Sequence, residues 1–200
     1  MGCRVSPRYV LFAGVNGAGK STLYHSGLWS RNEDDAALPR VNSDEILVRH
    51  GWDWADDAAQ LRAGKEALEL VRSYFSQGVS FNQETTLSGR SIMRNIKLAR
   101  DLGYKVVVHY VCLEDPLIAN ERIAYRVSRG GHEIKPEVVK RRYRSSLENL
   151  ATAVLLCDEL YLFDNTTQLK LVACIEEGRV VELSFPQPHW AQRILSESKV

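Results

Sequence analysis

A segment of nine residues near the start of the chain has the residue types and spacing of a phosphate-binding loop. It reads Gly14-Val15-Asn16-Gly17-Ala18-Gly19-Lys20-Ser21-Thr22 and satisfies the Walker A pattern. Its glycines let consecutive backbone N–H groups close around phosphate oxygens without obstruction from a Cβ atom. Lys20 offers a flexible cation to the β- and γ-phosphates, which makes it a catalytic candidate, and Ser21 offers a hydroxyl to Mg²⁺. The segment therefore predicts that residues 14 and 16–22 bind ATP and that Ser21 binds the metal.

Two acidic residues follow at positions where strands of a parallel sheet are expected to end. Asp44 lies in Asn42-Ser43-Asp44-Glu45, and Glu84 lies in Asn82-Gln83-Glu84-Thr85-Thr86. A kinase that acts on a hydroxyl needs a carboxylate to orient the incoming oxygen and accept its proton, so Asp44 is the candidate general base. The alternative for Asp44 is a helix N-cap, and the alternative for Glu84 is a solvated carboxylate at a strand end. Substrate binding is predicted for Asn42, Asp44, Glu84 and Thr85.

Arginines recur at helical spacing in the second half of the chain. Three of them share one side of a predicted helix, and further arginines follow after the break at Gly130-Gly131-His132. Two arginine-bearing helices joined by a flexible turn predict a lid over residues 120–145, which would close over ATP and neutralise charge on the transferring phosphoryl group. A solvated cationic face is the alternative for any single arginine, and His132 is given no catalytic role. The candidates are Arg126 and Arg142 for catalysis, Arg122, Arg129 and Arg141 for contact with ATP, and Asn165, after a later strand, for contact with the base.

The hydrophobic pattern supplies the elements that would position these residues. Apolar runs predict strands at 9–13, 79–82, 105–113 and 159–163, a hairpin over 169–175 and 179–183, and helices at 55–77, 89–102, 115–129, 136–153 and 190–195. In the first long helix, the side chains expected to share the buried face are Ala58, Leu61, Leu68, Val71 and Phe75. Strands that alternate with helices predict an α/β fold with a mostly parallel, doubly wound sheet, whose ligands bind at the carboxyl ends of its strands. Residues 1–200 are expected to form a single domain of the P-loop NTPase or kinase fold.

Composition argues against several other classes of protein. The chain has 200 residues, of which 44% are apolar and 26% charged, and its net charge of +1 gives no support for binding to nucleic acid or anionic lipid. No segment approaches the roughly 18 consecutive apolar residues that a membrane span needs. The cysteines lack the short paired spacing of zinc sites and disulfide frameworks, so they are expected to be small buried residues in a reducing cytoplasm. They are Cys3, Cys112, Cys157 and Cys174.

The motifs in combination resemble the zeta-toxin-like P-loop kinases, and in particular their compact bacterial branch. The resemblance rests on GVNGAGKST, VNSDEI, NQETTLSGR and RIAYRVSRGGHEIKPEVVKRRYRSSLENL, and it covers most of the chain. It implies that Lys20 and Ser21 hold ATP and Mg²⁺ and that lid arginines stabilise the transition state. It also implies that Asp44 deprotonates the acceptor hydroxyl, while Glu84 and Thr85 contact the acceptor. Zeta toxins phosphorylate the sugar of a UDP-N-acetylhexosamine and are held inactive by a small antitoxin protein, so the resemblance implies this acceptor and this kind of partner.

Other functions stay open on the sequence alone. The chain could be an ATPase or a sensor that binds nucleotide without an acceptor, although neither of these needs a base aimed at an acceptor or a lid that excludes water. It could also be a kinase of another nucleoside, dinucleotide or sugar. An ABC-type ATPase is disfavoured, because Leu87-Ser88-Gly89-Arg90 lacks a second glycine and follows the phosphate loop too closely for an inserted subdomain.

Overall fold

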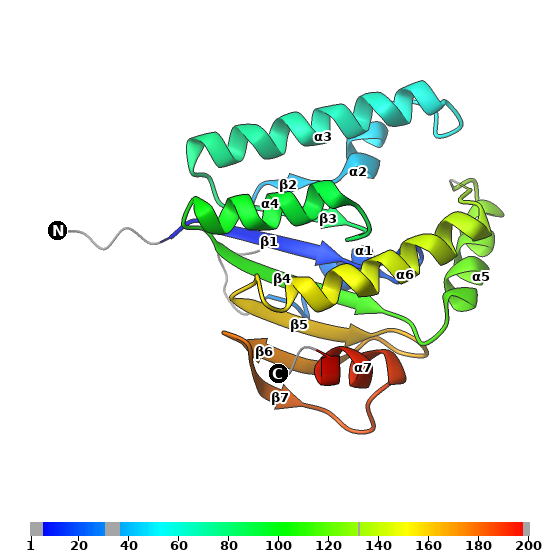
Figure 1. The fold of residues 1–200 in the computed structure, drawn as a ribbon. Coiled ribbons are helices and arrows are strands. Elements are labelled where there is room, and N and C mark those ends of the chain that lie inside the picture. The colour runs from blue at the N-terminus through cyan, green and yellow to red at the C-terminus, as the bar shows by residue number, and fades with distance from the viewer. Residues whose placement is uncertain (1–5, 31–36, 132, 198–200) are drawn as a thin grey trace.

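A seven-stranded sheet runs through the molecule in the order β2-β3-β1-β4-β5-β6-β7, with helices packed on both faces (Figure 1). The computed structural model describes residues 6–30, 37–131 and 133–197, so Cys3 and His132 lie outside the described residues. The parallel strands are β1 (Arg8–Ala13), β2 (Arg40–Val41), β3 (Phe81–Thr85), β4 (Lys105–Cys112) and β5 (Glu159–Asp164). The antiparallel strands are β6 (Lys170–Glu176) and β7 (Arg179–Leu183).

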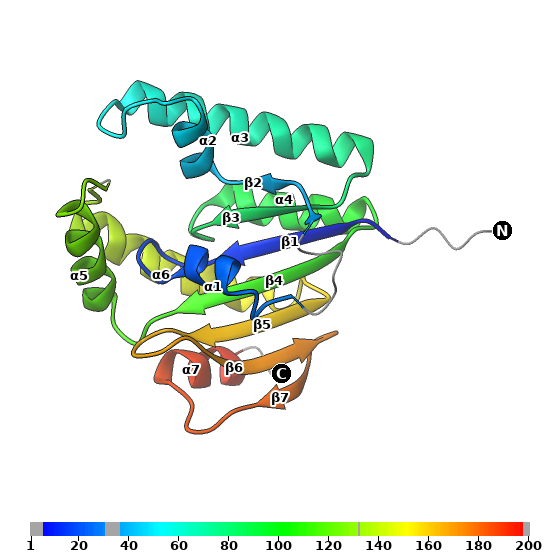
Figure 2. The same cartoon turned by 180° about the vertical axis from the view of Figure 1, so that it is seen from behind.

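The helices divide between the two faces of the sheet. They are α1 (Lys20–Ser26), α2 (Ser43–Arg49), α3 (Asp57–Gln77), α4 (Arg90–Asp101), α5 (Pro116–Val127), α6 (Pro136–Ala153) and α7 (His189–Glu197). Because side chains alternate along a strand, Tyr9 and Leu11 of β1 enter the core formed with α3, α4, α6 and α7. Val10 and Phe12 enter the opposite core, which α1 and α5 cover; Figure 2 shows α1 on this face. The central strand is therefore buried on both sides, as is usual for parallel sheets.

The path of the chain creates a crevice beside β1. From β1 the chain crosses to the edge strand β2, returns to β3 directly beside β1, and then crosses to β4 on the other side of β1. The connections that leave β1 and β3 therefore run in opposite directions. In doubly wound sheets, ligands bind at such a switch point, outside the carboxyl ends of the strands.

The prediction of a mostly parallel, doubly wound α/β sheet is confirmed, and two details of it need correction. Ala58, Leu61 and Leu68, expected on the buried face of α3, are exposed, Leu61 by 62% and Leu68 by 43%. The buried stripe carries Ala59, Ala63 and Ala67 beside the predicted Val71 and Phe75. Small side chains let this helix lie close to its neighbours, and a pattern read from the largest apolar residues misses such a stripe. Strand β3 also runs beyond the predicted residue 82 to Thr85, because its pairing with β1 continues as far as Ala13.

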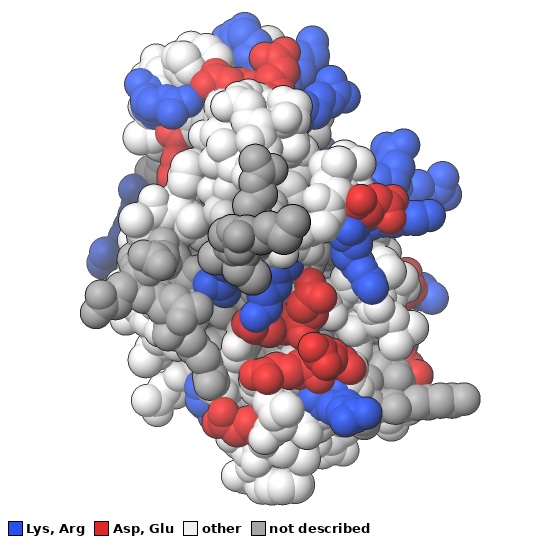
Figure 3. Space-filling model, turned by 90° about the vertical axis from the view of Figure 1, so that its left-hand side faces the viewer, with Lys and Arg blue, Asp and Glu red and all other residues white. Residues whose placement is uncertain are grey.

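The opposite edge of the sheet, where the parallel strands begin, serves structural roles. Figure 3 shows acidic side chains gathered in the lower half of this face, near the start of β5 and the β6–β7 turn. Asp158 accepts a hydrogen bond of 2.7 Å from the backbone N–H of Val106, and Glu159 pairs with Lys105. These carboxylates therefore fasten β4 to β5. In the part of the chain that the structure describes, no helix combines the length and apolar character required to cross a membrane.

Glycine substitutions in and after α3 test the backbone assignment. Gly64 lies inside the helix and Gly78 ends it at φ +66°, and a Cβ atom at either position would meet nothing within 4 Å. Gly64→Ala is expected to raise the free energy of unfolding by about 0.5–1 kcal/mol, because alanine loses less backbone entropy in a helix. Gly78→Ala is expected to lower it by about 1 kcal/mol, because alanine is strained in the left-handed region. Thermal unfolding of both variants checks this, and a shift of the same sign in both would contradict it.

Candidate active site

The loop between β1 and α1 adopts a conformation that only glycine permits at several positions. Gly14, Gly17 and Gly19 have φ values of +135°, +79° and +103°. A Cβ atom at Gly14 would lie 2.2 Å from the carbonyl oxygen of Val111, and one at Gly17 would lie 2.8 Å from that of Ala119. The loop therefore presses against β4 and α5, and glycines at these positions are what a backbone cradle for an anion requires.

Lys20 is buried at the end of the loop, facing Glu84. Its Nζ lies 3.2 Å from the carbonyl oxygen of Val15 and 3.7 Å from Oε1 of Glu84. Burial lowers the pKa of Lys20, and Arg126 and Arg142 add to this effect, while Glu84 and Asp44 oppose it. The surroundings therefore leave the ammonium incompletely compensated, and a polyphosphate would supply the missing negative charge.

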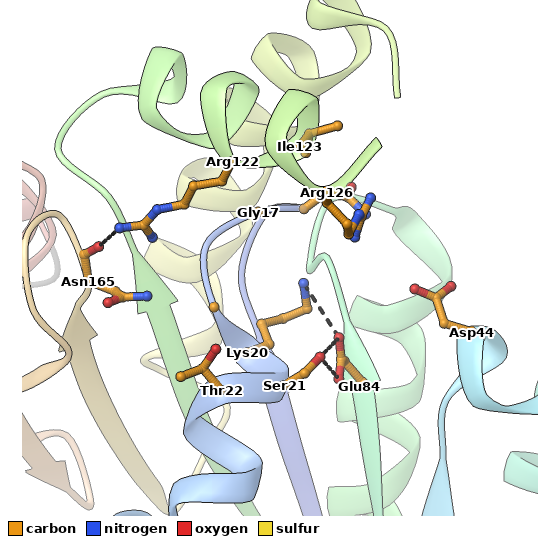
Figure 4. Close-up of a pocket in the computed structure, with 12 residues that line it drawn as sticks. Gly17, Lys20, Ser21, Thr22, Asp44, Glu84, Arg122, Ile123, Arg126 and Asn165 are labelled. Atoms are coloured by element: carbon orange, nitrogen blue, oxygen red, sulfur yellow. Dashed lines mark hydrogen bonds and ion pairs between the residues drawn. The ribbon is translucent and has the colours of Figure 1, made fainter. Parts of the chain in front are cut away.

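Glu84 lies against the phosphate loop. Its carboxylate is 3.2 Å from Oγ of Ser21 (Figure 4), and its predicted contact with the acceptor stays a prediction. It also accepts hydrogen bonds from Arg40 at 2.6 Å and from Asn42 at 3.2 Å. The reason lies in the sheet order, because β3 is the immediate neighbour of β1 and carries Glu84 to the loop. Arg40 was missed by the sequence analysis, although an arginine two residues before the predicted acceptor segment was a visible signal.

Asp44 enters the site from the first turn of α2. Asn42, not Asp44, is the N-cap, and its side chain accepts a hydrogen bond of 2.9 Å from the backbone N–H of Asp44. The capping alternative for Asp44 is therefore wrong, and Asn42, which was predicted to bind substrate, supplies the cap. Figure 4 shows the Asp44 carboxylate pointing into the cavity from the side opposite Asn165.

The lid helices α5 and α6 bring some of the predicted arginines to the site and leave others outside. Arg122 and Arg126 line the cavity above the loop, and Arg142 donates a hydrogen bond of 2.8 Å to the side chain of Asn16. Burial lowers the pKa of Arg142, and so does its neighbour Arg141, whereas Asp44 raises it. An arginine keeps its proton in spite of such a shift, so its charge remains available.

Arg129 and Arg141 do not line either cavity described below, so the prediction that they face ATP needs correction. Helix α5 ends at Val127, and the exposed Arg129 beyond it lies over the ring of Tyr125 at 4.8 Å. Adjacent residues of a helix point about 100° apart, so α6 can direct only one of two neighbouring arginines to the loop. That residue is Arg142, whereas Arg141 lines a separate hollow with Pro116.

Asn165 braces the phosphate loop. Its Nδ2 donates a hydrogen bond of 2.8 Å to the backbone carbonyl oxygen of Ala18. Its backbone carbonyl oxygen accepts a hydrogen bond of 2.8 Å from Arg122. A Cβ atom at Gly19 would lie 2.2 Å from this Nδ2, so the close approach requires glycine. The predicted contact of Asn165 with a base stays a prediction, but its place at the rim of the cavity is compatible with one.

Two cavities meet above the loop. The first, of about 320 Å³, lies over the loop and is bounded by Ser21, Thr22, Arg122 and Asn165. The second, of about 350 Å³, lies towards α2 and is bounded by polar side chains that include Asn42, Gln60, Thr85 and Arg142. Both cavities share Asn16, Lys20, Asp44, Glu84 and Arg126. Two molecules, one bound in each cavity, would therefore be in contact beside a lysine, two carboxylates and an arginine.

The family of the chain follows from comparison with known proteins. A family model described as an AAA domain matches residues 10–150, which include the loop, both carboxylates and the lid. The chain belongs to this family. A protein from Haemophilus influenzae, described as uncharacterized, is 34% identical over 134 residues, which make up 67% of this chain and 91% of that protein.

Solved structures show the same fold at low sequence identity. The chain is similar to AvrRxo1-ORF1:-ORF2 crystallised with ATP, with a TM-score of 0.67 and 15% identity over 98% of this chain; it spans 64% of the length of that chain. It is also similar to a structure of the PezAT chromosomal toxin-antitoxin system of Streptococcus pneumoniae, with a TM-score of 0.60 and 16% identity over 98% of this chain and 79% of that chain. The predicted P-loop NTPase or kinase fold is thereby confirmed. The acceptor named by the zeta-toxin resemblance is a separate matter, because this level of identity shows the fold alone.

Replacement of Lys20 by methionine is expected to make the protein more stable to heat and to abolish its binding of nucleotide. Because burial lowers the pKa of Lys20, the charged ammonium lowers the free energy of unfolding at neutral pH, and this penalty shrinks as the pH rises through the lowered pKa. Lys20→Met should therefore raise the midpoint of thermal unfolding at pH 7 and remove the further rise that Mg²⁺ and ATP produce. The control is Lys65→Met, an exposed lysine on α3, which should change neither quantity. A Lys20→Met protein that ATP still stabilises would contradict the assignment.

Proposed function

We propose that the protein is a kinase that uses ATP and Mg²⁺ to phosphorylate a hydroxyl group of a small molecule. The observation that carries the proposal is the junction of the two cavities at Lys20, Asp44, Glu84 and Arg126. A protein that only binds or hydrolyses nucleotide needs the first cavity alone. A second polar cavity that shares these charged groups gives an acceptor a place beside the γ-phosphate.

The described residues suit both ATP and Mg²⁺. The glycine turn has the close backbone approaches that a phosphate cradle requires, and the buried Lys20 lacks full compensation of its charge. The Ser21 hydroxyl and the Glu84 carboxylate, 3.2 Å apart, are oxygen donors of the kind that Mg²⁺ prefers. When bound there, Mg²⁺ would neutralise part of the charge on the phosphates. In the first cavity, Arg122 and Asn165 mark the end where the nucleoside would lie.

The residues of the junction divide the work of phosphoryl transfer. Asp44 orients the acceptor hydroxyl and takes its proton as the oxygen attacks the γ-phosphorus, while the bond from phosphorus to the leaving oxygen of ADP breaks. Lys20 stabilises the negative charge of the phosphates, and Arg126 and Arg142 stabilise that of the transferring group from the lid side. Lid helices above the loop also exclude water, which would otherwise compete with the acceptor.

The second cavity suits an acceptor rich in hydroxyl groups. Amide and hydroxyl side chains of Asn42, Gln60, Thr85 and Thr86 line it, and such groups both donate and accept hydrogen bonds. The resemblance to zeta-toxin-like kinases extends the proposal to a UDP-N-acetylhexosamine as acceptor. It also extends it to a small antitoxin protein as partner and to the cytoplasm as the place of reaction. The toxin-antitoxin system named for the similar pneumococcal structure supports the choice of partner to test.

The proposal is tested with γ-labelled ATP, Mg²⁺ and a panel of UDP-sugars, free sugars, nucleosides and dinucleotides. Label is expected on one class of acceptor, and Asp44→Asn should slow the transfer by about 10²–10⁴-fold, because it removes the base and keeps the shape of the side chain. ATP affinity of the variant, measured by calorimetry, should change little. Release of labelled phosphate to water in every reaction, at the same rate in wild type and Asp44→Asn, would overturn the kinase proposal in favour of an ATPase.

Adjacent arginines of α6 give a matched pair for the lid. Arg142→Ala is expected to lower kcat by about 10²-fold, because it removes a cation from the junction and its hydrogen bond to Asn16. Arg141→Ala should keep kcat within about twofold, as expected for an exposed side chain away from the site. Steady-state rates at saturating ATP and acceptor measure both effects. Equal losses in the two variants would mean that α6 contributes only general positive charge.

A further inference from the structure

One buried arginine joins the phosphate loop to the helix that carries Asp44. The side chain of Arg40, at the start of β2, is 8% exposed. Its Nη2 lies 2.6 Å from Oε2 of Glu84, its Nε lies 2.7 Å from Oε1 of Glu45, and its Nη1 lies 3.1 Å from Oδ1 of Asn82. The guanidinium also lies over the ring of Tyr24 in α1, 3.7 Å from its centre. A single side chain therefore contacts α1, α2 and β3.

The sheet register explains how Arg40 reaches so many partners. Strand β2 pairs in parallel with β3, and Arg40 stands opposite Asn82, so its long side chain extends along β3 towards Glu84. A guanidinium carries N–H donors in a planar fork and can satisfy two carboxylates and an amide at once, which the single point charge of lysine cannot do. The residue type therefore matches the geometry of its partners.

We propose that Arg40 is a positioning residue, which fixes the Glu84 carboxylate for the metal side of the site and ties it to α2. The inference rests on the proposed function insofar as Glu84 is assigned to the metal. Arg40 occupies Oε2 of Glu84, whereas Oε1 faces Lys20 at 3.7 Å. Asn42 closes the network, because its Nδ2 lies 3.2 Å from both Glu84 and Glu45.

Loss of Arg40 would redirect the carboxylate. The Glu84 side chain is only 11% exposed, so it would need another cation close by. Lys20 is the nearest one, and a Glu84 drawn towards it would leave its place beside Ser21. Arg40 thus keeps Glu84 available to the metal. The same change would release Glu45 and loosen the N-terminus of α2, which positions Asp44.

The test compares Arg40→Gln and Arg40→Lys with Arg49→Gln. Arg49 is the last residue of α2; its side chain is exposed and pairs with Glu66. Calorimetry measures ADP affinity with Mg²⁺ and with a chelator, so it depends on neither turnover nor an acceptor. Arg40→Gln should weaken Mg²⁺-dependent binding by about 10–100-fold, the range typical when a residue that orients a metal ligand is lost. Binding with chelator should change less than about threefold, Arg40→Lys should give an intermediate loss, and Arg49→Gln should match wild type.

A further variant keeps the test decisive if Arg40→Gln does not fold. Glu45→Gln removes one partner of Arg40 at a side chain that is 51% exposed, so it leaves no unpaired buried charge. It should weaken Mg²⁺-dependent binding in the same direction, but by less than Arg40→Lys. The inference would be overturned if the Arg40 variants lost equal ADP affinity with Mg²⁺ and with chelator. It would also be overturned if Arg40→Lys and Glu45→Gln both left the Mg²⁺ dependence of ADP affinity unchanged. Failure of the kinase proposal has a different signature, because labelled acceptor would then be missing in wild type while the Mg²⁺ effect of Arg40 persisted.

Discussion

A lysine ammonium must be kept charged and largely dry at the start of α1. Burial disfavours the charge of Lys20, and the carboxylates of Glu84 and Asp44 compensate for this only in part. That imbalance makes the place attractive to a polyphosphate, and it is tolerated because the rest of the fold is built around it. The glycine turn packs against β4 and α5, and Asn165 holds the loop from the far side through the carbonyl oxygen of Ala18.

The order of the strands supplies the charges that make this place a site. Strand β3 lies beside β1 and brings Glu84 to Ser21, and β2 lies beside β3 and brings Arg40 to Glu84. Helix α2 then starts directly after β2, so the backbone itself carries Asp44 to the edge of the second cavity. Each of these residues is thus placed by the element next to it, and together they lie at the carboxyl ends of neighbouring strands.

The lid approaches from the other side and adds positive charge. Arg126 belongs to both cavities, while Arg122 is tied to the strand-end segment at Asn165 and Arg142 to the loop at Asn16. These hydrogen bonds hold the lid helices near the loop. Solved structures that share only 15% and 16% sequence identity with this chain have the same fold, so the scaffold does not depend on the identity of most residues.

The sequence by itself determined what depends on neighbouring residues. The phosphate loop, most helix and strand boundaries and the α/β class follow from local composition and periodicity, because backbone conformation and amphipathic spacing are local properties. Only the tertiary structure decided which distant side chains meet. Sheet order placed Glu84 against the phosphate loop and made Arg40 its partner, and the rotation of α6 selected Arg142 over Arg141. The alanine stripe of α3 was likewise decided by packing. Such contacts depend on the order of strands and on close approach between elements, and neither is written in the spacing of residues along one segment.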